Sequence, residues 1–294
     1  MIVSRAIDPV RLARFLGLPL LLLVVYGAAI TLLHQGGQRW VAVNDLPLSL
    51  LGTAIALIVT FRNNAAYDRW WEARGLWGLT VNNSRSFARG VLTFVDDPVL
   101  RARLVRLQIA HALALRSALL EQAPWPDIVG HVPGPSLPVL RNSANVPAAI
   151  QGVIAQELAA ARRRGELDTI AAASLDATLL ALANAQGGLE RIKRTPLPRQ
   201  YNQFPKVFVG LYCALLPVGL VGDLGLFTAI VAPTIGFMFL SLDRIGHDLE
   251  DPFANSLHDI PMRAITRTIE IDLLQLVGVH DVPKAVAPVD GVLW

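Results

Sequence analysis

The chain has 294 residues, of which 53% are hydrophobic, and its mean hydropathy is +0.46. Ordinary soluble domains use roughly 45–50% apolar residues, so much of this chain is expected to lie in lipid. The formal net charge of +3 is too small to indicate nucleic-acid binding, and the single cysteine, Cys213, excludes an intrachain disulfide framework.

Four apolar segments are predicted to cross a membrane as helices, at residues 15–33, 46–61, 207–221 and 224–242. The first is too long for the apolar core of a signal peptide and lacks a cleavage site, so it is expected to be retained. The last two meet at Gly222-Asp223, a connection short enough to require an antiparallel hairpin. Each segment holds a proline, which a membrane tolerates only beside other helices or a wet cavity, so we predict a bundle or a water-filled path.

The positive charges predict the orientation of these segments. Of the 26 Lys and Arg residues, Arg39 alone lies in the connection between the first and second segments or between the third and fourth. Basic residues accumulate on the cytoplasmic side of membrane proteins. The opposite side, which carries both termini, is therefore predicted to be cytoplasmic.

The long interval between the second and third segments is predicted to be a helical cytoplasmic domain. Residues 98–115 carry apolar side chains along one side of a helix, with His111 among them. Residues 148–164 and 168–194 are rich in alanine and poor in β-branched runs, which favours helices. Residues 124–147 hold six prolines and are expected to form an extended loop.

After the fourth segment, residues 243–251 are predicted to extend its helix until Pro252 stops it. Residues 265–276 have the pattern of one more amphipathic helix. The stretch that follows contains Pro283 and Pro288 and is expected to be a tail on the surface.

Three motifs stand at separate places in the chain: residues 61–78 (FRNNAAYDRWWEARGLWG), 188–198 (GLERIKRTPLP) and 250–253 (EDPF). In this order they resemble bacterial bestrophin-type channels over nearly the whole chain. The resemblance implies an all-α membrane protein with four transmembrane helices and a helical cytoplasmic domain, assembled as a pentameric channel of the bacterial inner membrane. Its parts are residues 1–61 (helices 1 and 2), 62–205 (cytoplasmic domain), 206–242 (helices 3 and 4) and 243–294 (C-terminal helices and tail).

The resemblance also implies a hydrophobic neck, lined by three apolar residues of the second helix one turn apart. Counting back from Tyr67 places them at Leu46, Leu50 and Ala54. Narrow apolar rings gate ions by excluding water. Ala54 is smaller than the pattern requires, so either the neck is wider there or the register is shifted by one residue. A second constriction is expected in the cytoplasmic domain, with Ile170 as the candidate.

Arg62, Asn63 and Asn64 follow the second apolar segment at its predicted cytoplasmic end. Amide and guanidinium groups at a pore mouth could replace part of an ion's hydration shell. In the alternative interpretation, Arg62 anchors the helix at the membrane interface while the two asparagines cap it or bond to another helix. The sequence leaves both interpretations open.

For the function, the family resemblance indicates chloride or other monovalent anions, with a monovalent-cation-selective channel as the alternative. The expected partners are four further copies of the chain, the lipid bilayer and the permeating ions, and we expect no cofactor and no enzyme activity. Two other classes compete: a non-conducting scaffold, and a membrane metalloenzyme using His247 and Asp251, which share one helix face. No His-x-x-x-His or cysteine ligand set supports a metal, and residues 254–260 hold one acid, too few for a calcium clasp.

Overall fold

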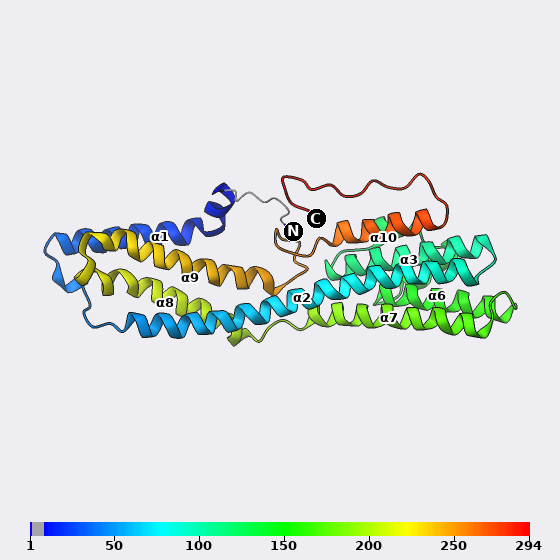
Figure 1. Cartoon of the computed structure of the whole chain (residues 1–294), viewed down its shortest axis with the longest axis horizontal. Helices are drawn as coiled ribbons and strands as arrows, with labels where there is room; N and C mark the ends of the chain where they lie inside the picture. Colours follow the sequence, from blue (N-terminus) through cyan, green and yellow to red (C-terminus); the bar gives the residue numbers. More distant parts are fainter. Residues whose placement is uncertain (2–8) are drawn as a thin grey trace. The chain divides into compact units, whose positions relative to one another are not determined.

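The structure, a computed structural model, describes the backbone of residues 1 and 9–294 and the side chains of residues 1 and 17–294 (Figure 1). Arg11 and Arg14, which carry part of the predicted charge asymmetry, have side chains outside this set. Within the described part, the secondary structure is helical and no strand is formed. The helices are α1 (Pro9–Gln35), α2 (Leu48–Phe94), α3 (Pro98–Leu119), α4 (Trp125–Ile128), α5 (Leu137–Arg141), α6 (Val146–Arg163), α7 (Thr169–Arg194), α8 (Arg199–Leu224), α9 (Thr228–Glu250) and α10 (Met262–Leu276).

The chain divides into two compact units, which are described separately. The apolar unit comprises Ser4–Trp70 and Pro196–Asp251, and the helical unit comprises Met1–Val3, Trp71–Thr195 and Pro252–Trp294. Helix α2 supplies residues 48–70 to the first and residues 71–94 to the second. It continues past Phe61 without a break, because no proline occurs between Pro47 and Pro98.

In the apolar unit, α1 packs against α8 and α9, and α8 packs against α9. The core joins all four helices and includes Leu23, Val59, Val209, Leu216 and Ala232. Helices α8 and α9 are connected by a 3-10 turn, Gly225–Phe227, where Gly225 has a φ of 51°. The hairpin therefore turns three residues after the predicted Gly222-Asp223, at a glycine that accepts a left-handed backbone conformation.

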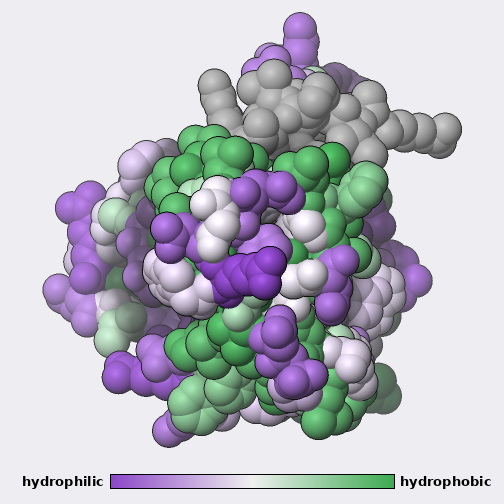
Figure 2. Space-filling view, turned by 90° about the vertical axis from the view of Figure 1, so that its left-hand side faces the viewer, coloured by the Kyte–Doolittle hydropathy of each residue, from purple (hydrophilic) through white to green (hydrophobic). Residues whose placement is uncertain are grey.

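Three helical segments of the described residues are long and apolar enough to cross a membrane: Gly17–Gln35, Leu48–Phe94 and Arg199–Glu250. The third contains both α8 and α9. Figure 2 views the molecule from the left-hand side of Figure 1 and shows polar and apolar side chains together at the surface. In the connections of the apolar unit, Trp40 and Phe227 are 77% and 71% exposed, and exposed aromatic rings of this kind are typical of a membrane–water interface.

In the helical unit, α3 is packed by α6, α7 and α10. The helices predicted within residues 98–115, 148–164, 168–194 and 265–276 are all present, as is the extension to Glu250 at the end of α9. The prediction of an extended loop over residues 124–147 is wrong in part, because α4 and α5 form there. Their prolines lie in the first helical turn, where a missing backbone N–H costs nothing.

A chain of hydrogen-bonded polar side chains crosses the core of the helical unit. His111 is fully buried, and its Nε2 atom lies 3.1 Å from Gln186 Oε1 and 2.9 Å from Gln151 Nε2. On the other side of the ring, Gln108 Nε2 donates to Ser84 Oγ at 2.9 Å. Because burying such groups is costly unless they are bonded, this network fixes how α2, α3, α6 and α7 meet.

Burial lowers the pKa of His111 to about 4, and the hydrogen bond that its Nε2 atom makes to Gln186 Oε1 opposes this only in part. The pKa of His111 in the folded state is below the unfolded value of 6.5, so the native state favours the neutral imidazole. The stability that this preference contributes is fully present above pH 6.5. This contribution, about 3 kcal/mol, is lost as the pH falls from 6.5 to 4.

We predict that His111→Gln removes this part of the acid sensitivity, measured as unfolding free energy against pH. The control His280→Gln, at an exposed position, should keep it, and an unchanged profile in His111→Gln would contradict the assignment.

Candidate pore face and the clamp behind it

In the apolar unit, one face of α2 is buried against its neighbours. Leu48, Ile55, Val59 and Arg62 lie on this face at helical spacing. Gly52 lies between them, and a Cβ atom there would be 2.6 Å from Tyr212 Oη of α8, so the glycine permits the close approach. Against the described part of the chain, the opposite face of α2 is exposed.

The opposite face carries one continuous line of exposed residues, which we call the open stripe: Leu50, Ala54, Leu57, Phe61 and Asn64. The spacing alternates between four and three residues, as it does for a single line along an α-helix. The exposed fractions are 70% for Leu50, 55% for Leu57 and 60% for Phe61. The stripe therefore presents an apolar line three turns long that ends at an amide.

The structure places the residues predicted for the neck differently from one another. Leu50 and Ala54 lie on the open stripe. Leu46 precedes α2 and is half-buried, with its side chain against Gly219 of α8. Leu57 and Phe61 continue the line that Leu50 and Ala54 begin, and neither was among the three positions predicted for the neck. The predicted positions are four residues apart, a spacing that leads on to Ile58 and the buried Arg62, whereas the exposed line has steps of four and three residues.

The residues predicted for the pore mouth also separate. Arg62 is 2% exposed, and its Nη1 and Nη2 atoms donate to Asp243 Oδ1 at 2.7 Å and to the Asp243 carbonyl oxygen at 2.6 Å. Asn63 Nδ2 donates to the carbonyl oxygen of Leu242 at 2.8 Å. Arg62 and Asn63 thus bond to α9, whereas Asn64 lies on the open stripe. We call the contacts of Arg62 and Asn63 with α9 the clamp.

A second contact between α2 and α9 lies seven residues further along both helices. Arg69 Nε donates to the carbonyl oxygen of Glu250 at 2.9 Å, at the end of α9 where carbonyl groups have no partner within the helix. Equal steps along both helices show that they run parallel here. Between the two contacts lies Gly246, where a Cβ atom would overlap Asn63 Oδ1 and lie 2.7 Å from Arg62 Nη2. Only glycine leaves room for the clamp.

Ile170, the candidate for the second constriction, belongs to the helical unit. It lies in the first turn of α7 and is 84% exposed. The carboxylate of Asp168 caps this helix by accepting from the backbone N–H groups of Ile170 and Ala171 at 2.7 and 3.1 Å. The cap stabilises the first turn of α7, so the exposed side chain of Ile170 is held in a defined position.

The residues that could have held a metal are not arranged as ligands. His247 is exposed, and its Nδ1 atom lies 3.9 Å from Glu250 Oε2. Among the described residues, no three His, Cys, Asp or Glu side chains are grouped so that they could hold a metal ion. Asp259, the single acid of residues 254–260, accepts from the backbone N–H and the hydroxyl of Ser256 at 2.6 and 2.7 Å.

These features define a class of protein: a helical membrane protein in which one helix shows an uncovered apolar line. The comparisons with known proteins identify the family. Residues 11–275 match the profile of the bacterial and fungal bestrophin proteins. The chain therefore belongs to the bestrophin family, whose members are channels and not enzymes.

Individual relatives agree with this assignment. The voltage-dependent anion channel-forming protein YneE of Escherichia coli K12 is 39% identical over 243 residues, covering 82% of this chain and 80% of that protein. A protein of the same description from Ralstonia nicotianae is 35% identical over 81% of this chain and 79% of its own. The crystal structure of a bacterial bestrophin homologue from Klebsiella pneumoniae, 34% identical, aligns with a TM-score of 0.84 over 89% of this chain and 98% of that one.

The clamp yields a test with a matched pair of glycines. We predict that Gly246→Ala lowers the unfolding free energy of the detergent-solubilised protein by about 2–3 kcal/mol, because the new methyl group displaces Arg62 and Asn63 from α9. Gly210→Ala, on α8 with no atom within 4 Å of the new Cβ, should instead be neutral or stabilising by up to about 1 kcal/mol. Denaturant titration measures both, and equal effects of the two substitutions would contradict the close-packed clamp.

Proposed function

We propose that the protein is an anion channel, in which five copies of the chain place α2 around a common axis in the bacterial inner membrane. The open stripe carries the proposal. In a lone chain this apolar line, three turns long, would face lipid. A helix surface that only contacts lipid can face any direction, so it would not require the buried clamp that fixes the rotation of α2. The relatives described as anion channel-forming proteins support conduction of anions.

The neck in this proposal is formed by rings of Leu50 and Ala54 and continues along Leu57 and Phe61. Leu46 lies at its outer entrance. Rings of apolar side chains offer water and ions few favourable contacts. A narrow passage between them therefore loses its water and stops conducting, and a small widening lets water and ions return. The ring of Ala54 is the widest of the four, which leaves Leu50, Leu57 and Phe61 as the narrow points.

The inner end of the passage is formed by Asn64, whose amide follows the last apolar ring. Arg62 and Asn63 act from behind: their bonds to α9 hold Asn64 and Phe61 in place. In the helical unit, the exposed Ile170 of each copy forms a second apolar constriction on the cytoplasmic path. No catalytic group or cofactor is needed for passive conduction.

Four crossings of the membrane are proposed, by α1, by the apolar part of α2, by α8 and by α9. Arg39 is the only Lys or Arg in the two short connections, and this distribution supports an orientation with both connections outside and both termini in the cytoplasm. Fivefold symmetry in averaged electron micrographs of the purified protein would support the pentamer, and a population of monomers or dimers would contradict it.

Selectivity for anions is tested by the reversal potential of the channel in a planar bilayer under a KCl gradient. We expect reversal near the chloride equilibrium potential. A reversal near the potassium equilibrium potential would instead establish a monovalent-cation channel, since uncharged rings of Leu and Ala do not by themselves distinguish the sign of an ion. Reconstitution without any current would favour a non-conducting scaffold.

Leu50 tests the neck itself. Because Leu50→Ala removes three carbon atoms from each of five side chains, it should widen the ring and raise the single-channel conductance or the open probability several-fold. Leu22→Ala makes the same change on α1, at a side chain that is 60% exposed but lies off α2, and should leave both unchanged. Conductance that responds to neither substitution, or equally to both, would contradict the proposed neck.

A further inference from the structure

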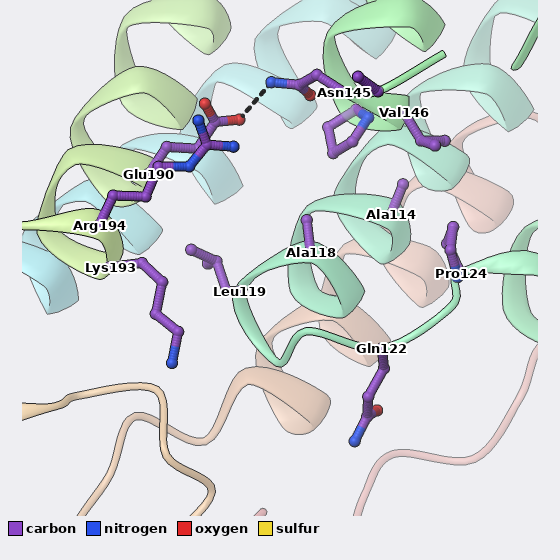
Figure 3. Close-up of a pocket in the computed structure, with 12 residues that line it drawn as sticks. Ala114, Ala118, Leu119, Gln122, Pro124, Asn145, Val146, Glu190, Lys193 and Arg194 are labelled. Carbon is purple, nitrogen blue, oxygen red and sulfur yellow. Dashed lines mark hydrogen bonds between the residues drawn. The ribbon is translucent and has the colours of Figure 1, made fainter. Parts of the chain in front are cut away.

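The helical unit contains a cavity that has no part in the conduction path proposed above. It has a volume of about 230 Å³ and lies between the C-terminal ends of α3 and α7, the start of α6 and the connection that follows α3 (Figure 3). This is smaller than the roughly 300–1,000 Å³ of sites for drug-sized molecules. A molecule of the size of an amino acid fits the space.

The wall of the cavity has two chemically distinct sides. Helix α3 and the start of α6 supply apolar side chains, among them Ala118, Leu119 and Val146. Helix α7 supplies three charged side chains within about one turn, Glu190, Lys193 and Arg194. A ligand with one apolar end and one charged end would have a matching surface on each side.

Glu190 is held in place by the buried network of the core. Its Oε1 atom accepts from Asn145 Nδ2 at 2.9 Å and from Gln186 Nε2 at 2.7 Å (Figure 3 shows the first of these bonds). Gln186 is 5% exposed and is itself bonded to the fully buried His111. Two amide donors on one oxygen fix the orientation of the carboxylate. Within the described residues no bond engages Oε2, so that oxygen remains available to a ligand.

The two cationic side chains of the cavity wall, Lys193 and Arg194, differ in the contacts that they make. Lys193 Nζ lies 3.8 Å from Glu121, a residue that does not line the cavity. Within the described residues, no ion pair or hydrogen bond engages the guanidinium of Arg194. A fixed carboxylate and an available guanidinium, four residues apart on α7, therefore offer one negative and one positive group beside an apolar wall.

We propose that this cavity binds a small zwitterion of the α-amino acid type with an aliphatic side chain. Its ammonium group donates to Glu190 Oε2, its carboxylate accepts from Arg194 and Lys193, and its side chain packs against Leu119 and Val146. The network behind Glu190 distinguishes this cavity from an ordinary surface hollow, because it holds a carboxylate of the cavity wall in one orientation. A bound ligand would contact α3, α6 and α7 at once and would hold the C-terminal ends of α3 and α7 against the start of α6.

The probe is leucine, and the measurement is titration calorimetry on the full-length protein in detergent. We expect saturable binding that Glu190→Gln weakens roughly ten- to a hundredfold, the loss expected for one charge-assisted hydrogen bond. This substitution keeps an oxygen that accepts from Asn145 and Gln186, so the network survives. Glu166→Gln removes an exposed carboxylate elsewhere in the helical unit and should leave leucine binding unchanged.

Two analogues separate the ends of the ligand. 4-Methylpentanoate lacks the ammonium group and 3-methylbutan-1-amine lacks the carboxylate, and each should bind at least tenfold more weakly than leucine. Binding of either analogue as tight as that of leucine would overturn the zwitterion in favour of a simple anion or cation. No binding of leucine at millimolar concentration, or equal binding to the wild type and Glu190→Gln, would overturn the site. Since calorimetry does not depend on current, neither result bears on conduction.

Discussion

The ion pair between Arg62 and Asp243 is the constraint on which the apolar unit depends. A buried guanidinium in a unit rich in apolar helices is tolerated only when its donors are matched, and here the carboxylate and a carbonyl oxygen of Asp243 match them. Gly246 makes the match possible by leaving no side chain in the way. Because removing either partner would leave a buried charge alone, the pair fixes the rotation of α2 about its own axis.

This one rotation determines which face of α2 is exposed. Arg62 is drawn toward α9, so Leu57 and Asn64, which lie on the other side of the helix from it, face outward. Leu50, Leu57 and Phe61 are exposed because Ile55, Val59 and Arg62 are buried. The polar side chains of Arg62 and Asn63 thus hold α2 against α9. The apolar residues on the other side of α2 form the open stripe, which we propose lines the path of the ions.

Much of the fold could be predicted from the sequence, because apolar length, helical periodicity and proline positions act locally. The helices within residues 98–115, 148–164 and 168–194 are of this kind, and so is the buried His111 on an apolar helix face. The short helices α4 and α5 were missed because proline is unfavourable within a helix but not in its first turn. The family was also recognisable, since residues 61–78 carry an unusual combination of aromatic, amide and charged side chains.

The arrangement of the candidate site was harder to predict, because it depends on contacts between residues distant in sequence. That Arg62 binds Asp243, 181 residues later, is not encoded in any local pattern. The only signal was the presence of one arginine and one aspartate, each at the end of an apolar segment. Without that contact the sequence left Arg62, Asn63 and Asn64 equivalent, and the structure separates two that bond to α9 from one that lies on the open stripe.

The central claim is that the open stripe borders water, and cysteine accessibility tests it most directly. Cys213 is the single native cysteine and is buried, so replacing it by alanine gives a background for Leu57→Cys and, as control, Leu22→Cys. We predict that a charged, membrane-impermeant thiosulfonate reduces the current of the Leu57→Cys channel and leaves that of Leu22→Cys unchanged. If Leu57→Cys reacted only with lipid-soluble reagents while the current persisted, the stripe would face lipid and the account would be wrong.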